Sequence, residues 1–288
     1  MNRTETFDPR WNSIGSALAA EAVPVDGSAT DQYSLRKILS IWAAAALPMA
    51  FLGWVLPALV GPLDLGVGDA NNVAFTRALF LTLGLIWQFV LSMAIIRHEE
   101  GDLRWSTIRR RCWLNKPRDP KTGQGRGKLW LWLVPVVFLA AAIQMAPLQD
   151  AWNALFPFLG EPSKYSFESV VNSDERKAAL EGAWQVLGLF VVLGVFNTIL
   201  GEELLFRGIL LPKMQGVFGK RDWLANGVLF GLYHLHQPWS IFGSAIGGTL
   251  TYALPSRRFR SAWMGIIIHS VETVFFIFLA LGLVLGMA

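Results

Sequence analysis

The sequence has few charged residues and almost no cysteine. Only 16% of its 288 residues are charged, against 53% that are hydrophobic, and it contains a single cysteine, Cys112. One cysteine excludes a scaffold stabilised by intramolecular disulfides. The high apolar and aromatic content excludes a disordered or collagen-like chain. So much apolar surface is not easily hidden in one soluble core, and the mean hydropathy of +0.41 is typical of a membrane protein.

Basic residues are concentrated in short stretches between apolar segments. A net charge of +4 is compatible with nucleic-acid binding, but membrane topology explains this distribution more simply. The sequence contains no internal repeat and no low-complexity block. We therefore expect a lipid bilayer as a partner and no nucleic acid.

Long apolar windows divide the chain into candidate membrane spans. The hydrocarbon core of a bilayer is roughly 30 Å thick, so a helix needs about 20 apolar residues to cross it. The fifth and sixth windows are short for a full crossing and can form a tight helical hairpin. We predict an all-α, polytopic integral membrane helical bundle with about seven transmembrane helices, or eight. The windows lie near Ile38–Val60, Phe75–Ile96, Leu129–Leu148, Ala183–Leu211, Trp223–Pro238, Ile241–Leu254 and Ala262–Leu285.

The connector Arg97–Lys128 is strongly basic. By the positive-inside rule, such a connector faces the cytoplasm. Alternation then places the N-terminus inside and the C-terminus outside, with the acidic connector Asp150–Glu181 on the outer side. We expect the plasma (inner) membrane of a bacterium. Residues 1–36 are a polar cytoplasmic tail without a signal-peptide pattern, and residues 37–288 are the transmembrane domain.

Charged residues interrupt the fourth window. A charge in hydrocarbon costs roughly 2.5 to 3.5 kcal/mol on the lower of the disputed scales, so its presence indicates a functional site. Glu203 and Arg207 stand at i and i+4, the favourable order for an ion pair on one helix face. Glu202 is rotated by about 100° from Glu203 and has no basic residue one turn further on, so it must face another helix or water. A catalytic base needs this placement; the alternative is an acid pair that reaches to the cytoplasm.

The fifth window contains two histidines. Phe230 and His234 are one helical turn apart on a common face. His236, close to a proline, is expected at the membrane interface. The sixth window contains Gly243 and Gly247, a small-residue spacing that we expect to bring helices together and to compact the polar cluster.

The seventh window places His269, Glu272 and Thr273 on one helical face. With a rise of 1.5 Å per residue, Glu202, His234 and His269 lie roughly 14, 18 and 12 Å from the cytoplasmic ends of their windows. We therefore expect these three side chains to converge near the middle of the bilayer.

Such a cluster fits hydrolysis of an amide bond inside the membrane. That reaction needs a sequestered water, a base to deprotonate it and donors for the developing oxyanion. Glu202, His234 and His269 can provide all of these without a cofactor. The same residues can instead form an open three-ligand site for a divalent metal such as zinc, although the sequence contains no His-Glu-x-x-His segment. Both interpretations stay open at this point.

The polar motifs of the fourth, fifth and seventh windows, taken in the order in which they occur, resemble those of the CAAX protease and bacteriocin-processing (Abi) family. This family includes the type II CAAX prenyl endopeptidases. The resemblance covers roughly the last 100 residues and implies an all-helical intramembrane protease with its catalytic core in about residues 183–288. The matching residues are Glu202-Glu203-x-x-x-Arg207-Gly208, Phe230-x-x-x-His234 and the final-window His269.

The resemblance also implies a role for each residue. Glu202 is the general base, His234 orients the water and His269 helps to stabilise the oxyanion. Family members commonly have Asn four residues after the last histidine, whereas this chain has Thr273, whose hydroxyl offers one donor in place of two. The supporting residues are Glu203, Arg207, Phe230 and Thr273.

We therefore predict a membrane-embedded endopeptidase that cleaves a membrane-associated protein or peptide, with a prenylated CAAX-like protein as one option. The alternative is a noncatalytic membrane scaffold or a bacteriocin-immunity protein, in which the polar cluster serves helix packing. A transporter with an intramembrane proton relay is disfavoured, because the spans show no repeat and no pair of corresponding broken helices.

Overall fold

The computed structural model describes residues 31–287 and is helical, with no strand among them. Most of the expected N-terminal tail, residues 1–30, lies outside the described part. The all-α architecture and the apolar helices agree with an integral membrane protein.

Five helical stretches in the described part of the chain are long and apolar enough to cross a membrane. The fifth and sixth predicted windows form shorter helices, so the predicted number of seven or eight spans is not confirmed. The five stretches are Leu35–Val60, Asp69–Glu100, Gly127–Leu155, Trp184–Lys213 and Trp263–Val284. The helices are α2 (Leu35–Ala50), α3 (Leu56–Val60), α4 (Asp69–Glu100), α5 (Trp105–Arg111), α6 (Leu133–Met145), α7 (Leu148–Leu155), α8 (Phe167–Val171), α9 (Asp174–Ala178), α10 (Trp184–Val195), α11 (Gln215–Phe218), α12 (Asp222–Tyr233), α13 (Ile241–Gly247), α14 (Leu254–Phe259) and α15 (Trp263–Val284).

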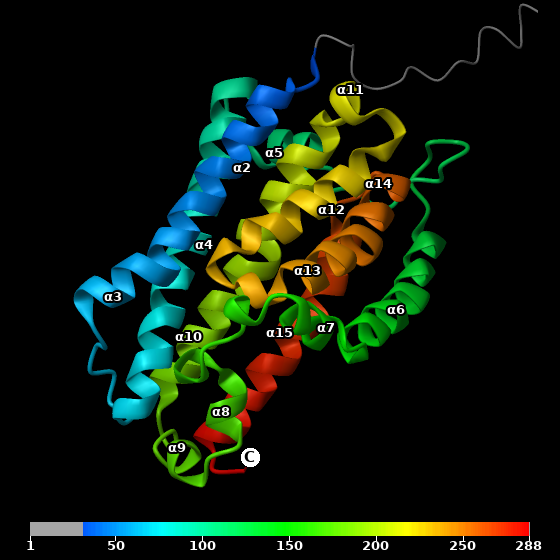
Figure 1. Cartoon of the computed structure of the whole chain (residues 1–288). Coiled ribbons are helices and arrows are strands. Elements are labelled where there is room, and N and C mark those ends of the chain that lie inside the picture. The colour runs from blue at the N-terminus through cyan, green and yellow to red at the C-terminus, as the bar shows by residue number, and fades with distance from the viewer. Residues whose placement is uncertain (1–30, 288) are drawn as a thin grey trace, which may run out of the picture.

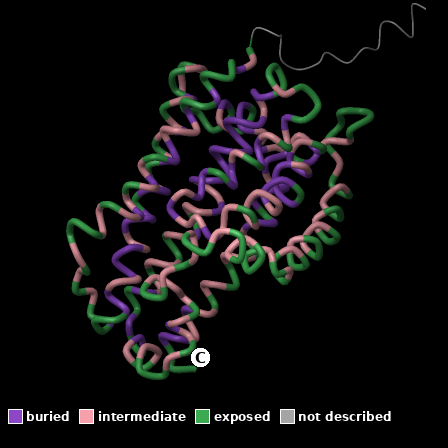
Figure 2. Tube along the Cα trace, in the orientation of Figure 1, coloured by how far each residue is buried: buried purple, intermediate pink, exposed green. Residues whose placement is uncertain are grey.

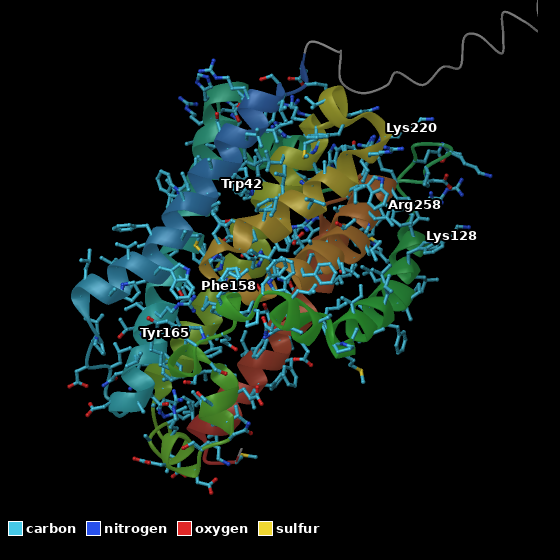
Figure 3. The ribbon with its side chains drawn as sticks, in the orientation of Figure 1. Trp42, Lys128, Phe158, Tyr165, Lys220 and Arg258 are labelled. Atoms are coloured by element: carbon cyan, nitrogen blue, oxygen red, sulfur yellow. The ribbon has the colours of Figure 1, made fainter. Side chains whose placement is uncertain are left out.

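The bundle has two distinct ends. In Figure 1, α5 and α11 lie at the end where α2 begins, and α14 lies toward that end, whereas α8, α9 and the C-terminal end lie at the opposite one. Basic side chains gather at the first end: Lys128, Lys220 and Arg258 are all found toward it in Figure 3, while Tyr165 lies toward the other end. We call the first end the basic end. It contains the basic connector that the sequence analysis predicts to face the cytoplasm.

Burial separates a protein core from a lipid-facing surface. Buried residues concentrate inside the bundle in Figure 2, while α6 has no buried residue. Large apolar side chains such as Phe138 and Phe278 are 71% and 68% exposed. In water such exposure is unfavourable, but lipid tails are as apolar as these side chains. The outer surface is therefore suited to a bilayer.

Close packing of glycines occurs on α12, not at the pair that the sequence suggests. A Cβ at Gly243 or Gly247 would meet nothing within 4 Å, so these glycines do not bring two helices together. A Cβ at Gly231 would lie 2.5 Å from the Cβ of Ala245, and one at Gly227 would lie 2.0 Å from the hydroxyl of Thr249. The prediction for the sixth window was wrong because the spacing does not say which helix faces which.

We expect Gly231→Ala to destabilise the protein by about 1–3 kcal/mol, the usual cost of overpacking a well-filled contact. Gly247→Ala is the matched control, because its added methyl group meets open space. Thermal unfolding of the two purified variants in detergent measures the difference. Equal loss of stability in both variants would contradict this assignment of the packed face.

Candidate active site

Glu202 and Glu203 lie between two π-helical segments, Phe196–Gly201 and Leu204–Leu210. Such segments are rare, and when they interrupt an α-helix they often mark functional sites. At the first of them, a Cβ on Gly201 would lie 3.0 Å from the carbonyl oxygen of Leu85, so the helix passes close to α4. Both acids are buried in the protein, with exposed fractions of 3% and 0%.

Glu203 is the centre of a buried charge network. Its Oε1 lies 3.0 Å from Nη1 of Arg207, in the i, i+4 pair that the sequence predicts. The same oxygen lies 3.1 Å from Nδ1 of His269, which is placed to donate its proton. Arg207 in turn donates from Nη2 to the carbonyl of Gly248 at 3.1 Å. The network therefore connects three helical stretches: the one that carries both acids, the sixth window and α15.

The guanidinium of Arg207 is also held by an aromatic ring. It lies 4.2 Å from the ring centroid of Phe230, within the range of a cation–π contact. A Cβ at Gly248 would lie 2.5 Å from the Phe230 ring, so glycine there makes room for it. Phe230 thus supports the ion pair of the site as well as the neighbouring His234.

His234 stands where α12 ends and a short 3-10 turn, His234–His236, begins. Its Nδ1 lies 2.8 Å from the carbonyl of Phe230, and since a carbonyl can only accept, Nδ1 carries the proton. In the neutral ring, Nε2 is then free to accept a hydrogen bond from water. His236, expected at the interface, is instead buried, with its ring centroid 5.4 Å from that of His234.

His269 is positioned by a stacked tyrosine. The rings of His269 and Tyr252 are nearly parallel, with centroids 4.6 Å apart. Since Nδ1 faces Glu203, Nε2 is the nitrogen of His269 that remains for a ligand. One turn further along α15, the methyl group of Thr273 packs against Gly194, where an added Cβ would lie 2.4 Å from it.

Most of the predicted site residues line one cavity of about 790 Å³. This volume is within the usual range of ligand pockets. Its lining includes apolar side chains of α6 and α15, with Glu272 and Thr273 at one wall. Of the predicted site residues, Glu203 and Arg207 lie behind the wall and are fully buried. Those that reach the cavity are Glu202, Phe230, His234, His269 and Thr273.

Sequence reasoning missed Tyr233 and Gln88. The hydroxyl of the fully buried Tyr233 accepts a hydrogen bond from Nε2 of Gln88 at 2.6 Å. In this contact the hydroxyl is the acceptor and keeps its own proton. A glutamine in the middle of the second apolar window was the signal that could have revealed this contact.

Asn197 is a third polar residue that sequence reasoning missed. It lies on the π-helical segment before Glu202, lines the cavity and makes no side-chain hydrogen bond with any described residue. Its amide offers two donors. An asparagine inside the fourth window was visible in the sequence.

Among residues 31–287, no group of three His, Cys, Asp or Glu side chains is placed to hold a metal ion. Glu202, His234 and His269 face one cavity but do not converge as a first coordination sphere. The three-ligand interpretation therefore does not fit this arrangement.

Cys112 is buried at the basic end, outside the membrane-spanning stretches, with none of its surface exposed. Burial raises the pKa of its thiol to about 12. The thiol is therefore protonated at neutral pH and unreactive. We expect N-ethylmaleimide to leave the folded protein unmodified at pH 7 and to modify it after denaturation, as measured by intact mass. Complete modification of the folded protein would contradict this.

The fold and the site define a helical membrane protein with a buried glutamate–histidine cluster on a large cavity. Residues 183–275 match the model of the type II CAAX prenyl endopeptidase Rce1-like family. The match confirms the resemblance in the segment that contains Glu202, His234 and His269, and it supports a CAAX-type intramembrane protease at the level of the family. No curated protein and no solved structure matches the chain.

Proposed function

We propose that this protein is an intramembrane endopeptidase that hydrolyses a peptide bond of a membrane-associated protein or peptide. The observation that carries the proposal is the common cavity of Glu202, His234 and His269. These residues come from three separate helical stretches, and charged or polar groups inside a membrane are costly, so their presence indicates a functional site.

The proposed reaction uses the side-chain atoms of these three residues that remain available to water and substrate. A water held between the Glu202 carboxylate and Nε2 of His234 gives one proton to Glu202 and attacks the carbonyl carbon of the substrate. The C–O bond forms while the carbonyl electrons move to oxygen, and a protonated His269 donates from Nε2 to that oxyanion. The intermediate then breaks its C–N bond, and Glu202 returns the proton to the leaving amine.

Other residues hold these three in place or add donors to the cavity. Glu203 holds Nδ1 of His269, and Arg207 balances the charge of Glu203. Thr273, at the position of the family's asparagine, offers one hydroxyl donor, and Asn197 supplies two amide donors to the same cavity. We therefore assign Asn197 to the oxyanion-binding side of the site.

Asn197→Leu is expected to lower kcat by about 10²–10³-fold, the usual effect of losing one oxyanion donor. Its side chain has no partner among the described residues, so the fold should be retained, as checked by thermal unfolding. Thr198→Val, on the same turn but bonded to the carbonyl of Gly194, is the control. An Asn197→Leu variant with unchanged kcat would remove Asn197 from the site.

The apolar wall of the large cavity indicates which kind of substrate fits it. It includes Val137 and Ala140 of α6, a helix without buried residues, and Phe275 and Phe276 of α15. An apolar wall next to a lipid-facing helix suits a substrate that enters with an attached lipid chain. This supports a prenylated CAAX-like protein as the substrate.

We further propose that the basic end faces the cytoplasm of a bacterial cell, with the enzyme in the plasma membrane. The basic connector Arg97–Lys128 supports this orientation. In this arrangement residues 1–36 are a cytoplasmic tail, residues 37–288 form the transmembrane domain, and the catalytic core lies in about 183–288.

The function is tested without any assumption about the substrate. Protein termini are compared by mass spectrometry in cells that contain the wild type or Glu202→Ala at equal membrane abundance. Termini found only with the wild type support proteolysis, and their sequences identify candidate substrates. If no terminus differs in cells where the wild type is shown to be functional, the noncatalytic scaffold or immunity protein becomes the better explanation.

A further inference from the structure

A second cavity lies at the basic end and shares no lining residue with the large one. Its volume is about 80 Å³. Its walls come from the segment just before α2, from α5 and the connector after it, from the turn between the Glu202 helix and α11, from the start of α12 and from the end of α14. Four of its lining residues are arginines: Arg110, Arg118, Arg257 and Arg260. We call it the arginine cavity.

Two of these four charges have no partner among the residues that the structure describes. Arg110 pairs with Glu100 at 2.8 Å, and Arg257 pairs with Asp222 at 2.5 Å. The guanidinium groups of the half-buried Arg118 and Arg260 make no hydrogen bond or ion pair with any residue in the range 31–287. Asp222 also lines the cavity, but its charge is balanced by Arg257. The net excess of positive charge at one small polar cavity indicates an anionic ligand.

The backbone around the arginine cavity is held in an unfavourable conformation. Trp113 and Arg260 are the two residues other than glycine with positive φ in the described part of the chain, at 52° and 44°, and both line the cavity. Such conformations persist only where the surroundings hold them, and they cluster at ligand sites. Here the amide of Arg118 donates to the carbonyl of Phe259 at 2.8 Å, and that of Ala262 donates to Trp113 at 3.0 Å.

The size of the cavity restricts the ligand. A cavity needs about 10–15 Å³ of free volume to hold a single water molecule. The arginine cavity therefore has room for about five to eight non-hydrogen atoms. A phosphate group has five, whereas a nucleoside has many more. The planar guanidinium forks of Arg118 and Arg260 match the oxygen atoms of phosphate in pairs.

We propose that the arginine cavity binds a phosphate group. The cavity lies among the ends of helical segments that continue into the apolar stretches. At that level of a membrane the phosphate of an anionic phospholipid headgroup is available. Free phosphate offers the same chemistry. Basic pockets between transmembrane helices commonly receive such headgroups.

A bound phosphate would connect three helices that carry the active site. Pro212 follows the Glu202 helix, Asp222 begins the helix that leads to His234, and Arg260 precedes the helix that carries His269. Binding at this end would therefore stabilise their relative positions. The proposal does not depend on proteolysis, because binding and stability can be measured without a substrate.

The test uses the full-length protein. Its thermal unfolding midpoint is measured in detergent with inorganic phosphate against chloride at equal ionic strength, and in nanodiscs of phosphatidylcholine with or without phosphatidylglycerol. We expect at least one of these anions to raise the midpoint of the wild type by about 2 °C or more. Arg118→Gln and Arg260→Gln should abolish the shift. Arg258→Gln removes an equal charge from an exposed neighbour outside the cavity and should keep it.

The outcomes distinguish the sources of the phosphate group. A shift with phosphatidylglycerol alone identifies a lipid headgroup, and a shift with inorganic phosphate alone identifies a soluble ligand. Arg118→Lys keeps the charge without the fork and should retain the fold with a reduced shift. No shift with either anion, or equal loss of the shift in Arg258→Gln, would overturn the proposal.

Discussion

Purified Glu202→Gln is expected to cleave its substrate about 10²–10⁴ times more slowly than the wild type, the range that a positioned general base contributes. Glutamine keeps the shape of the side chain, but it cannot take a proton from water. The loss should appear in kcat, because the substitution removes chemistry and leaves the apolar wall unchanged. The measurement uses a peptide from a terminus found only with the wild type.

Glu175→Gln is the control for this experiment, because it makes the same chemical change at an exposed position on α9. It should leave kcat unchanged. Equal thermal unfolding midpoints for wild type and Glu202→Gln would show that the fold is intact. A Glu202→Gln protein that retains wild-type kcat would remove Glu202 from its role as the base.

Arg207→Leu is expected to destabilise the protein by about 3–5 kcal/mol, because it leaves Glu203 charged and buried without its partner. Both side chains have no exposed surface, so water cannot replace the lost guanidinium. Membrane abundance and thermal unfolding in detergent measure this loss. The expected result is a protein that is degraded in cells or unfolds far below the wild type.

A double variant separates stability from activity. Glu203→Leu together with Arg207→Leu removes both charges, and replacing a buried pair by apolar residues is often neutral or stabilising. We therefore expect recovery of much of the stability. Cleavage should stay low, because His269 no longer has an acceptor for its Nδ1 proton. Full activity in a stable double variant would contradict the supporting role of the pair.

Local spacing predicted the contacts that lie within one helix. The i, i+4 rule placed Glu203 beside Arg207, and they form an ion pair at 3.0 Å. The same spacing placed Phe230 beside His234, and the two are joined by a hydrogen bond from Nδ1 to the carbonyl. Hydropathy predicted the apolar helices, because a bilayer demands a fixed length of apolar chain.

Contacts between helices could not be predicted in this way. Gly227 and Gly231 form the close contact with the next helix, although Gly243 and Gly247 have the same spacing. Tyr233 reaches Gln88 on α4, 145 positions away in the sequence. Which faces meet depends on the packing of the whole bundle, and a single sequence records only the periodicity of each helix.

The π-helical segments beside the two acids have a consequence for evolution. A π turn accommodates one residue more than an α turn, so a single-residue deletion within Phe196–Gly201 would restore regular winding and rotate everything that precedes it by about 100°. Asn197 would then leave the cavity while Glu202 stayed. Relatives without this turn should align with a one-residue gap between Asn197 and Glu202. Insertion and deletion, as well as substitution, can therefore change which side chains offer hydrogen-bond donors to the site.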